Sequence, residues 1–283
     1  MKLSVVIVTF NEEANIGRTL ASVQGLVVDS KGEIIVVDSG STDHTTEVAK
    51  SFGAKVFVEE WKGFASQKNS AIDKAAGEWI LSLDADEEIE RQLATLVSHA
   101  VQERPPHPKL ELLQALAAER GEAWPPPANM SGYWMQRRNM FLGRWMKHGG
   151  FWPDPKLRLF RKGAGRFESR LVHEDLQVEG SIGRLRSGAL LHHSYPTLSD
   201  YIEHMNRYSS LGAEMVVAKG NGKGNVRFRV INIVLRPLAT FVYNYFFRLG
   251  FLDGREGLLL HAYHAVYVSW KYAKAWELSR KQS

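Results

Sequence analysis

The sequence predicts an α/β protein built on a parallel, doubly wound sheet. Four short runs rich in Val and Ile lie in the first 90 residues, at positions 3–10, 33–38, 54–58 and 79–84. Near-continuous apolar runs of this length are typical of parallel strands that are buried on both faces. Helical patterns separate the runs, and this alternation favours a parallel sheet with helices on its faces.

Three helices are expected between these strands. The first, over residues 11–23, has apolar side chains at the spacing of one helix face. The second is expected to start at a cap formed by Ser41 or Thr42. The third covers residues 65–76 and ends at Gly77, a residue that favours helix ends.

The remainder of the chain is less regular. Residues 104–131 are rich in proline and indicate an insertion or mobile loop. Residues 133–193 contain short strand-like runs, as in a mixed sheet edge, and residues 198–219 form a helical pattern. A Gly-rich break then divides an α/β domain, residues 1–219, from a C-terminal segment, residues 220–283.

Composition limits the protein class. The chain of 283 residues has no cysteine, so disulfides and thiolate metal sites are excluded. The N-terminal apolar run is short and acidic residues follow it at once, unlike a signal peptide, so we expect a cytoplasmic protein. Residues 1–100 hold 9 Lys and Arg against 16 Asp and Glu, whereas residues 201–283 hold 12 against 5. Either surface charge simply varies along the chain, or the basic tail faces an anionic partner.

Polar residues leave three of the predicted strands, at positions 9–12, 38–43 and 84–88. Ligands of open α/β sheets bind beyond the carboxyl ends of the strands, so these segments are expected to converge on one site. Asp84 and Asp86 form a D-x-D pair that can hold a hard divalent cation, with a diphosphate supplying further oxygen ligands. Such pairs also occur by chance in acidic loops, but the position after an apolar strand favours the metal.

Several of these side chains have two interpretations. Asp38 can accept a hydrogen bond from a base N–H, or it can shape the start of the next helix. Phe10 can stack on a base, or it can belong to the core. Glu12 can bind a ribose hydroxyl, or it can complement the helix dipole as a first-turn acid.

Other nucleotide enzymes fit less well. Nucleotidyltransferases and dinucleotide oxidoreductases place a Gly-rich loop after the first strand, whereas this chain has Thr9-Phe10-Asn11-Glu12-Glu13. Nucleic-acid binding is not expected, because the basic residues of the tail adjoin apolar residues rather than forming a solvated stripe.

The motifs SVVIVTFNEEANI, VVDSGSTDHT and QKNSAIDKAAGEWILSLDADEEI resemble the N-terminal half of family 2 glycosyltransferases of the GT-A fold. The resemblance covers residues 2–90 in strong form. It implies a Rossmann-like nucleotide-binding mixed sheet flanked by helices, with residues 1–219 as the catalytic domain. It also implies an inverting enzyme that uses a nucleotide sugar, with UDP-sugars favoured, and usually Mn²⁺ or Mg²⁺.

The resemblance also implies roles for single residues. Thr9, Phe10 and Glu12 hold the nucleoside, and Asp38 reads the base. Lys68 lies near the nucleotide, Asp84 approaches the ribose or donor sugar, Asp86 binds the metal, and Glu88 is a further metal ligand.

In the second half, GGFWPDPKLRLFRKG, RLVHEDL and LLHHSYPTLSDYI resemble bacterial transferases of lipopolysaccharide core assembly, the β-1,4-glucosyltransferases. Inversion needs a general base for the acceptor hydroxyl. The subgroup pattern favours Glu174, with Asp175 as the second choice; an exposed acidic turn is the alternative for both. The insertion at residues 104–131 departs from the compact pattern and leaves the acceptor side open.

Further candidates come from residue chemistry. Arg158 and Arg161 can bind the donor diphosphate through forked hydrogen bonds, or they can simply fold the sheet edge. His192 can complete the metal shell, because imidazole suits Mn²⁺-like metals, or it can be a polar residue at a strand end.

The C-terminal segment contains the apolar run VINIVLRPLATFVYNYFFRL, residues 230–249. We expect no spanning helix, because Arg236 and Pro237 interrupt a run that is short of about 20 apolar residues. On a helix, Asn232, Arg236, Thr240, Asn244 and Arg248 would form one polar stripe. The amphipathic extension can lie in a membrane interface, form a homo-oligomer, or pack on the catalytic core.

The expected function is transfer of glucose or another hexose from a UDP-sugar to a hydroxyl of a lipid-linked glycan, such as lipopolysaccharide inner core. We expect it at the cytoplasmic face of the inner membrane, as a peripheral protein. The alternatives are a transferase that uses ADP-heptose or a GDP-sugar, and a non-catalytic sugar- or nucleotide-binding scaffold on a degenerate transferase fold.

Overall fold

The computed structural model describes residues 1–102, 129–168, 175–220 and 226–281. The chain forms two compact units. Unit 1 contains Met1–Arg137 and Asp154–His192, and unit 2 contains Arg138–Pro153 and His193–Ser283.

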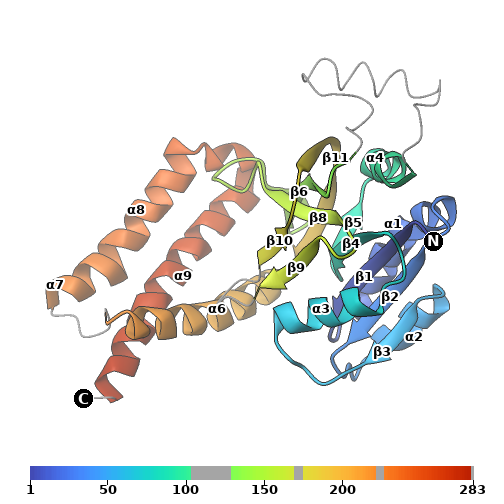
Figure 1. The fold of residues 1–283 in the computed structure, drawn as a ribbon. Coiled ribbons are helices and arrows are strands. Elements are labelled where there is room, and N and C mark those ends of the chain that lie inside the picture. The colour runs from blue at the N-terminus through green and yellow to red at the C-terminus, as the bar shows by residue number, and fades with distance from the viewer. Residues whose placement is uncertain (103–128, 169–174, 221–225, 282–283) are drawn as a thin grey trace. The chain divides into compact units, whose positions relative to one another are not determined.

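Within the described residues, nine strands form a mixed sheet in the order β3-β2-β1-β4-β8-β6-β11-β5, with β7 paired to β6 (Figure 1). Strands β1 to β4 pair in parallel, and β8 joins β4 in the antiparallel sense. The predicted fold class, a mixed α/β sheet flanked by helices, is confirmed. The strands are β1 (Leu3–Thr9), β2 (Glu33–Asp38), β3 (Lys55–Val58), β4 (Trp79–Asp84), β5 (Glu87–Ile89), β6 (Gly132–Phe141), β7 (Arg144–Trp145), β8 (Pro155–Arg161) and β11 (Ile182–Tyr195).

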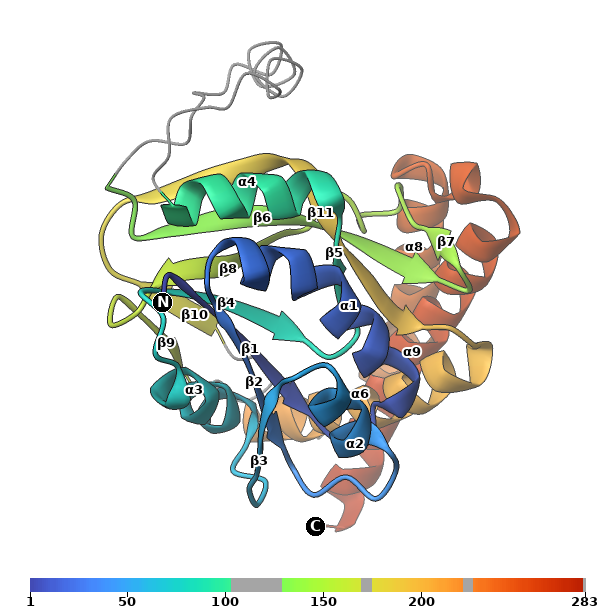
Figure 2. The ribbon, with the colours of Figure 1, turned by 90° about the vertical axis from the view of Figure 1, so that its right-hand side faces the viewer.

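Helices cover both faces of the parallel part of the sheet, because its strands are apolar on both sides. Along β1, Val5 and Ile7 pack into the core beneath α1, whereas Val6 packs into the core on the α3 side. Figure 2 shows α1 in front of β1 and β4. The helices of unit 1 are α1 (Glu13–Asp29), α2 (Thr45–Ser51), α3 (Phe64–Lys74) and α4 (Arg91–Gln102).

The expected cap of α2 by Ser41 or Thr42 is wrong. The helix begins at Thr45, whose N–H donates to the Asp43 carboxylate at 3.0 Å. The Ser41 hydroxyl instead accepts from the backbone N–H of Asn11 at 2.8 Å. Residues 41 and 42 therefore join two loops and do not start the helix.

A short antiparallel ribbon, β9 (Gly165–Glu168) and β10 (Asp175–Val178), lies outside the main sheet. The Asn69 side chain of α3 binds the backbone of Phe167 in this ribbon twice. Its amide donates to the Phe167 carbonyl at 2.9 Å, and its oxygen accepts from the Phe167 N–H at 3.0 Å. Asn69 thus takes the place of a neighbouring strand for the ribbon. The predicted insertion at residues 104–131 lies outside the described residues apart from its last three.

Unit 2 is mainly helical. Helix α6 starts at a capping box, in which Thr197 and Asp200 each bond to the other's backbone N–H. It is tied to α9 by the Lys274 ammonium, which donates to the Asn206 side chain at 2.7 Å and to Ser209 at 2.8 Å. The helices are α6 (Leu198–Ala218), α7 (Val226–Arg229), a π-helix (Val230–Leu235), α8 (Arg236–Val242), a second π-helix (Tyr243–Phe247), a 3₁₀ turn (Gly250–Asp253) and α9 (Gly254–Lys281).

The compact units differ from the expected division at residue 219. Helix α6 groups with the C-terminal helices because it packs along α9, whereas the expected division placed it with residues 1–219.

Residues 226–247 form one continuous helical run. Pro237 does not break it, since proline sits at the start of α8, where its missing N–H costs little. Val230–Phe247 is long and apolar enough to cross a membrane by length and composition, with a mean hydropathy of 1.3. Pro237 therefore does not interrupt the helix, and of the two expected interruptions only the charge of Arg236 remains.

Glu59 ties α3 to the end of β3. Its carboxylate binds the ammonium of Lys74 at 2.5 Å and accepts from the Ser70 hydroxyl at 2.7 Å. These hydrogen bonds lower the pKa of Glu59 from 4.5 to about 2. Because the pKa in the folded protein lies below that in the unfolded chain, the stabilisation is present above pH 4.5 and is lost as the pH falls toward 2.

We expect Glu59→Gln to lower the free energy of unfolding at pH 7, because the ion pairs are lost. The difference from wild type should shrink as the pH falls from 5 to 2. Urea unfolding across that range measures it, with Glu60→Gln as the control, since Glu60 is exposed. A difference that stays constant down to pH 2 would show that charge is not the cause.

Candidate active site

The strand register brings three predicted motifs to one edge of the sheet. Thr9 at the end of β1 lies opposite Asp38 at the end of β2, and Val8 lies opposite Asp84 at the end of β4. Neighbouring strands lie about 4.8 Å apart, so side chains that leave these ends share one region.

Two of the loops at this edge are fixed to each other. Asn11 adopts a left-handed conformation with φ of 53°, and its side-chain oxygen accepts from the N–H of Thr42 at 2.9 Å. The Glu13 carboxylate accepts from the N–H of His44 at 2.9 Å, and the Thr45 hydroxyl accepts from the N–H of Glu12 at 2.8 Å. The loops after β1 and β2 therefore form one platform.

Asp38 is fully buried and shapes the turn that follows it. One carboxylate oxygen accepts from the N–H groups of Gly40 and Ser41 at 3.0 and 2.8 Å, and the other accepts from the Ser41 hydroxyl at 2.5 Å. Gly40 has φ of +90°, a conformation that other residues rarely adopt. Because a carboxylate offers about four acceptor positions, one stays open. Reading of the base by Asp38 stays a prediction.

Hydroxyls and an aromatic ring lie beside this turn. Thr9 is 3% exposed, and within the described residues its hydroxyl has no hydrogen-bond partner, nor does the buried hydroxyl of Ser39. Buried polar groups normally have partners, so such hydroxyls are suited to bind a ligand. Phe10 is 55% exposed, which excludes it from the core and leaves its ring available for stacking.

Glu12 lies near several other carboxylates at this edge of the sheet. Its carboxylate accepts from the Asn15 amide at 2.9 Å. Burial raises its pKa, and the nearby carboxylates of Asp86, Asp43 and Asp84 raise it further, against the Asn15 hydrogen bond. Carboxylates from three loops therefore act on one place, which favours binding of a cation there.

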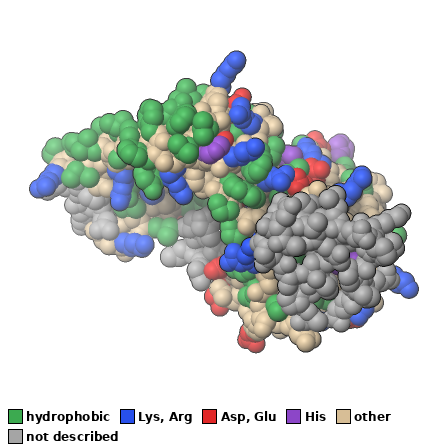
Figure 3. Space-filling view, turned by 90° about the horizontal axis from the view of Figure 1, so that it is seen from above, with side chains coloured by type: hydrophobic (Ala, Val, Ile, Leu, Met, Phe, Trp, Pro, Cys, Tyr) green, Lys and Arg blue, Asp and Glu red, His purple; other side chains and the backbone are tan. Residues whose placement is uncertain are grey.

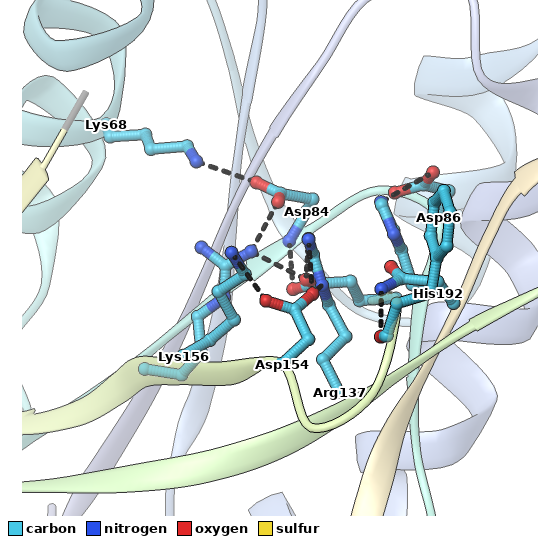
Figure 4. A network of polar contacts seen from close by, with 11 residues as sticks. Lys68, Asp84, Asp86, Arg137, Asp154, Lys156 and His192 are labelled. Atoms are coloured by element: carbon cyan, nitrogen blue, oxygen red, sulfur yellow. Dashed lines mark hydrogen bonds and ion pairs between the residues drawn. The ribbon is translucent and has the colours of Figure 1, made fainter. Parts of the chain in front are cut away.

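Asp84 is neutralised by two basic residues (Figure 4). The Lys68 ammonium lies 2.7 Å from one of its carboxylate oxygens, and Arg158 binds the other. Although burial opposes it, the charges of Arg158 and Lys68 hold the pKa of Asp84 well below its usual range. Lys68 also lies 5.2 Å from the centre of the Phe167 ring. The structure brings Lys68, Asp84 and Arg158 together and buries Arg158 in ion pairs, whereas their expected roles toward the donor stay predictions.

A chain of alternating charges continues from Arg158. Glu87 is fully buried and lies 2.6 Å from Arg158 and 3.3 Å from Arg137, which in turn binds Asp154 at 2.9 Å. Burial lowers the pKa of Arg158, but the carboxylates of Asp84 and Glu87 outweigh it and raise that pKa.

Glu87 and Asp154 were not among the site residues expected from the sequence. A signal was present: a strand such as β8 that buries an arginine requires acidic partners, and both acids lie in motifs already noted.

Asp86 and His192 form a second pair, 3.4 Å apart. His192 lies opposite Glu87 in the pairing of β11 with β5. Burial, with help from Arg137, lowers the pKa of His192 against the pull of Asp86. The imidazole is therefore neutral at pH 7, which is the state that binds metals.

Asp86 and His192 together suit Mn²⁺-like cations. No group of three or more acidic, His or Cys side chains arranged to hold a metal occurs among the residues that the structure describes. A cation here would take its remaining ligands from a diphosphate, which fits the chemistry of these two donors.

Two residues that were expected in the site, Glu88 and Arg161, do not lie beside Asp84 and Asp86. Glu88 lies opposite Leu191 in the strand pairing, so it points to the other face of β5 from Glu87 and His192. Arg161 pairs with Trp79 at the start of β4, while Asp84 stands at its end. Its guanidinium stacks over the Trp79 ring at 4.6 Å, so Arg161 folds the sheet. The assignments of Glu88 to the metal and Arg161 to the diphosphate are therefore not kept.

One of the two expected general bases lies among the described residues. Asp175 is the first residue of β10 and is exposed, whereas Glu174 lies outside the described residues. Asp175 pairs with Glu168, the neighbour of Phe167, whose ring faces Lys68.

Residues 4–152 match the model of the glycosyl transferase family 2. The chain belongs to this family. The match covers more than half of the chain and includes all three strand-end motifs, so the protein is a glycosyltransferase.

Relatives and solved structures agree with this assignment. The chain is 30% identical to the lipopolysaccharide core biosynthesis glycosyltransferase LpsC of Rhizobium meliloti, over 98% of this chain and 93% of that protein. It is 29% identical to an uncharacterized glycosyltransferase of Rickettsia typhi, over 99% of this chain and 88% of that protein. A mannosyltransferase of Pyrobaculum calidifontis, solved with GDP-Man and Mn²⁺, is similar in fold, with a TM-score of 0.51 and 14% identity, covering 97% of this chain and 86% of that one.

We expect Glu87→Ala to destabilise the protein by about 3–5 kcal/mol, because it leaves the buried guanidinium of Arg158 with one acidic partner fewer. The matched control is Asp73→Ala, which breaks an exposed ion pair with Arg166 and should cost less than about 1 kcal/mol. Urea unfolding at pH 7 compares the two variants. Equal effects would show that the buried ion pairs of Glu87 contribute no more to stability than an exposed ion pair does.

Proposed function

We propose that the enzyme transfers a sugar from a nucleotide sugar to an acceptor hydroxyl with inversion at the anomeric carbon. The observation that carries the proposal is the pair Asp86 and His192 beside the neutralised Asp84, at the sheet edge where β1, β2 and β4 end. This arrangement offers a place for a cation and a diphosphate next to a nucleoside platform.

The donor nucleoside is proposed to lie on the joined loops after β1 and β2. The exposed ring of Phe10 stacks on the base, and a base N–H reaches the buried Asp38 carboxylate when the side chains over it move aside. The unpartnered hydroxyl of Thr9 and the carboxyl of Glu12 face the ribose. Asp38 is held by backbone N–H groups and the two loops are joined by hydrogen bonds before the donor arrives, so little ordering of the backbone is needed on binding.

The donor diphosphate is proposed to lie toward Asp86. A Mn²⁺ or Mg²⁺ ion held by Asp86 and His192 would neutralise charge on the leaving diphosphate. Lys68 and Arg158 keep Asp84 ionised and in place, so that its carboxylate can accept hydrogen bonds from the donor sugar or ribose.

Glu174 is proposed to take the proton from the acceptor hydroxyl, with Asp175 as the second candidate. The oxygen of that hydroxyl attacks the anomeric carbon on the face opposite the diphosphate, and the bond to the diphosphate breaks as the new one forms. A single displacement of this kind inverts the anomeric configuration.

The proposed donor is a UDP-hexose, and the proposed acceptor is a lipid-linked glycan such as lipopolysaccharide inner core. The name of the Rhizobium meliloti relative supports the acceptor class. The Pyrobaculum mannosyltransferase, solved with GDP-Man and Mn²⁺, supports a nucleotide sugar with a metal and keeps a GDP-sugar as an alternative donor. ADP-heptose is the other alternative.

We expect the wild-type protein to bind UDP in Mn²⁺ by titration calorimetry, and to bind it at least about tenfold more weakly in EDTA or as Asp86→Ala. GDP and ADP titrations identify the donor class. Asp73→Ala is the control, because its carboxylate is exposed on α3. Folded protein that binds none of the three diphosphates would overturn the donor site and favour a non-catalytic scaffold.

We expect Glu174→Gln to retain UDP binding and to lose transfer, by a factor of about 10² to 10⁴, because only the proton acceptor is removed. Asp175→Asn should lose far less. The assay is sugar transfer to lipopolysaccharide inner core, with calorimetry alongside. If Asp175→Asn is the inactive variant, Asp175 is the base.

A further inference from the structure

Unit 2 carries an exposed apolar stripe. Its members recur about every fourth residue along residues 226–247 and are between 46% and 75% exposed: Val226, Val230, Val234, Leu238, Phe246 and Phe247. Only 6% of the span Val230–Phe247 is buried. Single exposed apolar residues are ordinary, but a continuous stripe of this length marks an interaction surface.

The amphipathic pattern of this helical run is inverted relative to a helix in water. Arg236 donates to Asn232 at 3.1 Å and to the hydroxyl of Tyr272 in α9, and its guanidinium lies over the Tyr272 ring. Arg229 lies 5.1 Å from the Trp276 ring of α9. These polar residues turn toward the protein's own helix and the apolar ones turn away, whereas a helix facing water does the reverse.

Charge identifies the surface that fits this stripe. Residues 226–252 contain four arginines and no acidic residue. Two copies meeting through this surface would bring eight positive charges together, which opposes self-association. An anionic phospholipid surface complements both features, since its negative charge attracts the positively charged run and its acyl chains accept the apolar side chains. Figure 3 shows hydrophobic side chains gathered along one side of this part of the chain, with Lys and Arg beside them.

The helical run does not cross the bilayer alone, because it is fastened along α9. The Ser269 hydroxyl of α9 donates to the Ile233 carbonyl at 2.8 Å, and Arg236 stands in the middle of the run. A crossing would draw Arg236 and, on α9, Lys271 and Lys274 toward the hydrocarbon, which is costly. A position in the plane of the interface keeps all three on the protein's own side of the run, out of the hydrocarbon.

We propose that the apolar stripe of unit 2 docks into the interfacial region of an anionic phospholipid bilayer, parallel to its plane. The inference goes beyond the proposed transfer reaction and does not depend on it. Nucleotide binding is measured without lipid, so failure of one proposal leaves the other standing. Placement at the cytoplasmic face of the inner membrane stays a prediction.

The absence of cysteine from the sequence permits a direct test. Single substitutions Val234→Cys, Leu238→Cys and Phe247→Cys are labelled with an environment-sensitive fluorophore in the otherwise unchanged full chain. Val28→Cys is the matched control, because Val28 is an apolar residue of α1 that is 72% exposed. The probe is a vesicle of phosphatidylcholine with phosphatidylglycerol, compared with phosphatidylcholine alone.

We expect a blue shift and stronger emission for the three labels on the stripe with anionic vesicles, and no change for the label at position 28. Lipids with quenchers at shallow depth should quench all three labels more than lipids with quenchers near the bilayer centre. Quenching of the label at position 238 mainly by the deep quencher would show a spanning helix and overturn the proposal.

Vesicle co-sedimentation gives an independent measure. The double variant Val234→Asp/Leu238→Asp should bind anionic vesicles at least about tenfold more weakly, and added salt should weaken wild-type binding. Val28→Asp should bind as wild type does. Wild-type protein that does not bind these vesicles would contradict the proposal. A wild-type dimer in light scattering that is absent in the double variant would also contradict the proposal, because the stripe would then contact a second copy.

Discussion

The geometry of the site depends on charge compensation around one buried arginine. Arg158 lies between Asp84 and Glu87, and it holds both acids in a region where water is largely excluded. A lone charge in such a region is strongly unfavourable, so each partner is required by the others. Because Asp84 closes β4 and Glu87 opens β5, this compensation also fixes the turn that carries Asp86.

The platform formed by the loops after β1 and β2 is stabilised in a different way. Its carboxylate and amide side chains accept hydrogen bonds from backbone N–H groups. Asp38 does so within its own turn, and Asn11 does so between the loops after β1 and β2. Such contacts create few charges but remove conformational freedom from the loops. The site thus combines a rigid platform with a chain of ion pairs, and the acidic positions left over lie between them, at Glu12 and Asp86.

The sequence was most informative where periodicity and strand ends determine structure. The four apolar runs became β1 to β4, because near-continuous apolar runs form buried parallel strands. The contacts of Lys68 and Arg158 with Asp84 were not predicted. Roles that depend on the face of a short strand or on distant pairing could not be read in the same way. Glu88 and Glu87 are adjacent acids, and only the pairing with β11 determines which one turns toward Arg158.

The helical run of residues 226–247 shows the same limit of prediction from local sequence. Its fourfold polar repeat was visible in the sequence, and the repeat predicts a polar stripe and an apolar face. The repeat does not say which face meets the protein, because either can pack on a neighbour that offers polar groups. Tyr272 and the aromatic side of α9 decide this by binding Arg236. Such partners lie some 40 residues away in the chain, beyond the reach of local patterns.

The attachment of the β9–β10 ribbon through Asn69 has an evolutionary consequence. The ribbon is fastened to α3 by the Asn69 amide and by the Arg166–Asp73 ion pair, and its Phe167 and Leu176 side chains join the core cluster that includes α3. Substitutions in α3 that remove these groups would therefore loosen the ribbon without breaking a hydrogen bond of the main sheet. A fastening of this kind lets the ribbon and α3 change together during evolution, as one unit, while the strands of the main sheet stay as they are.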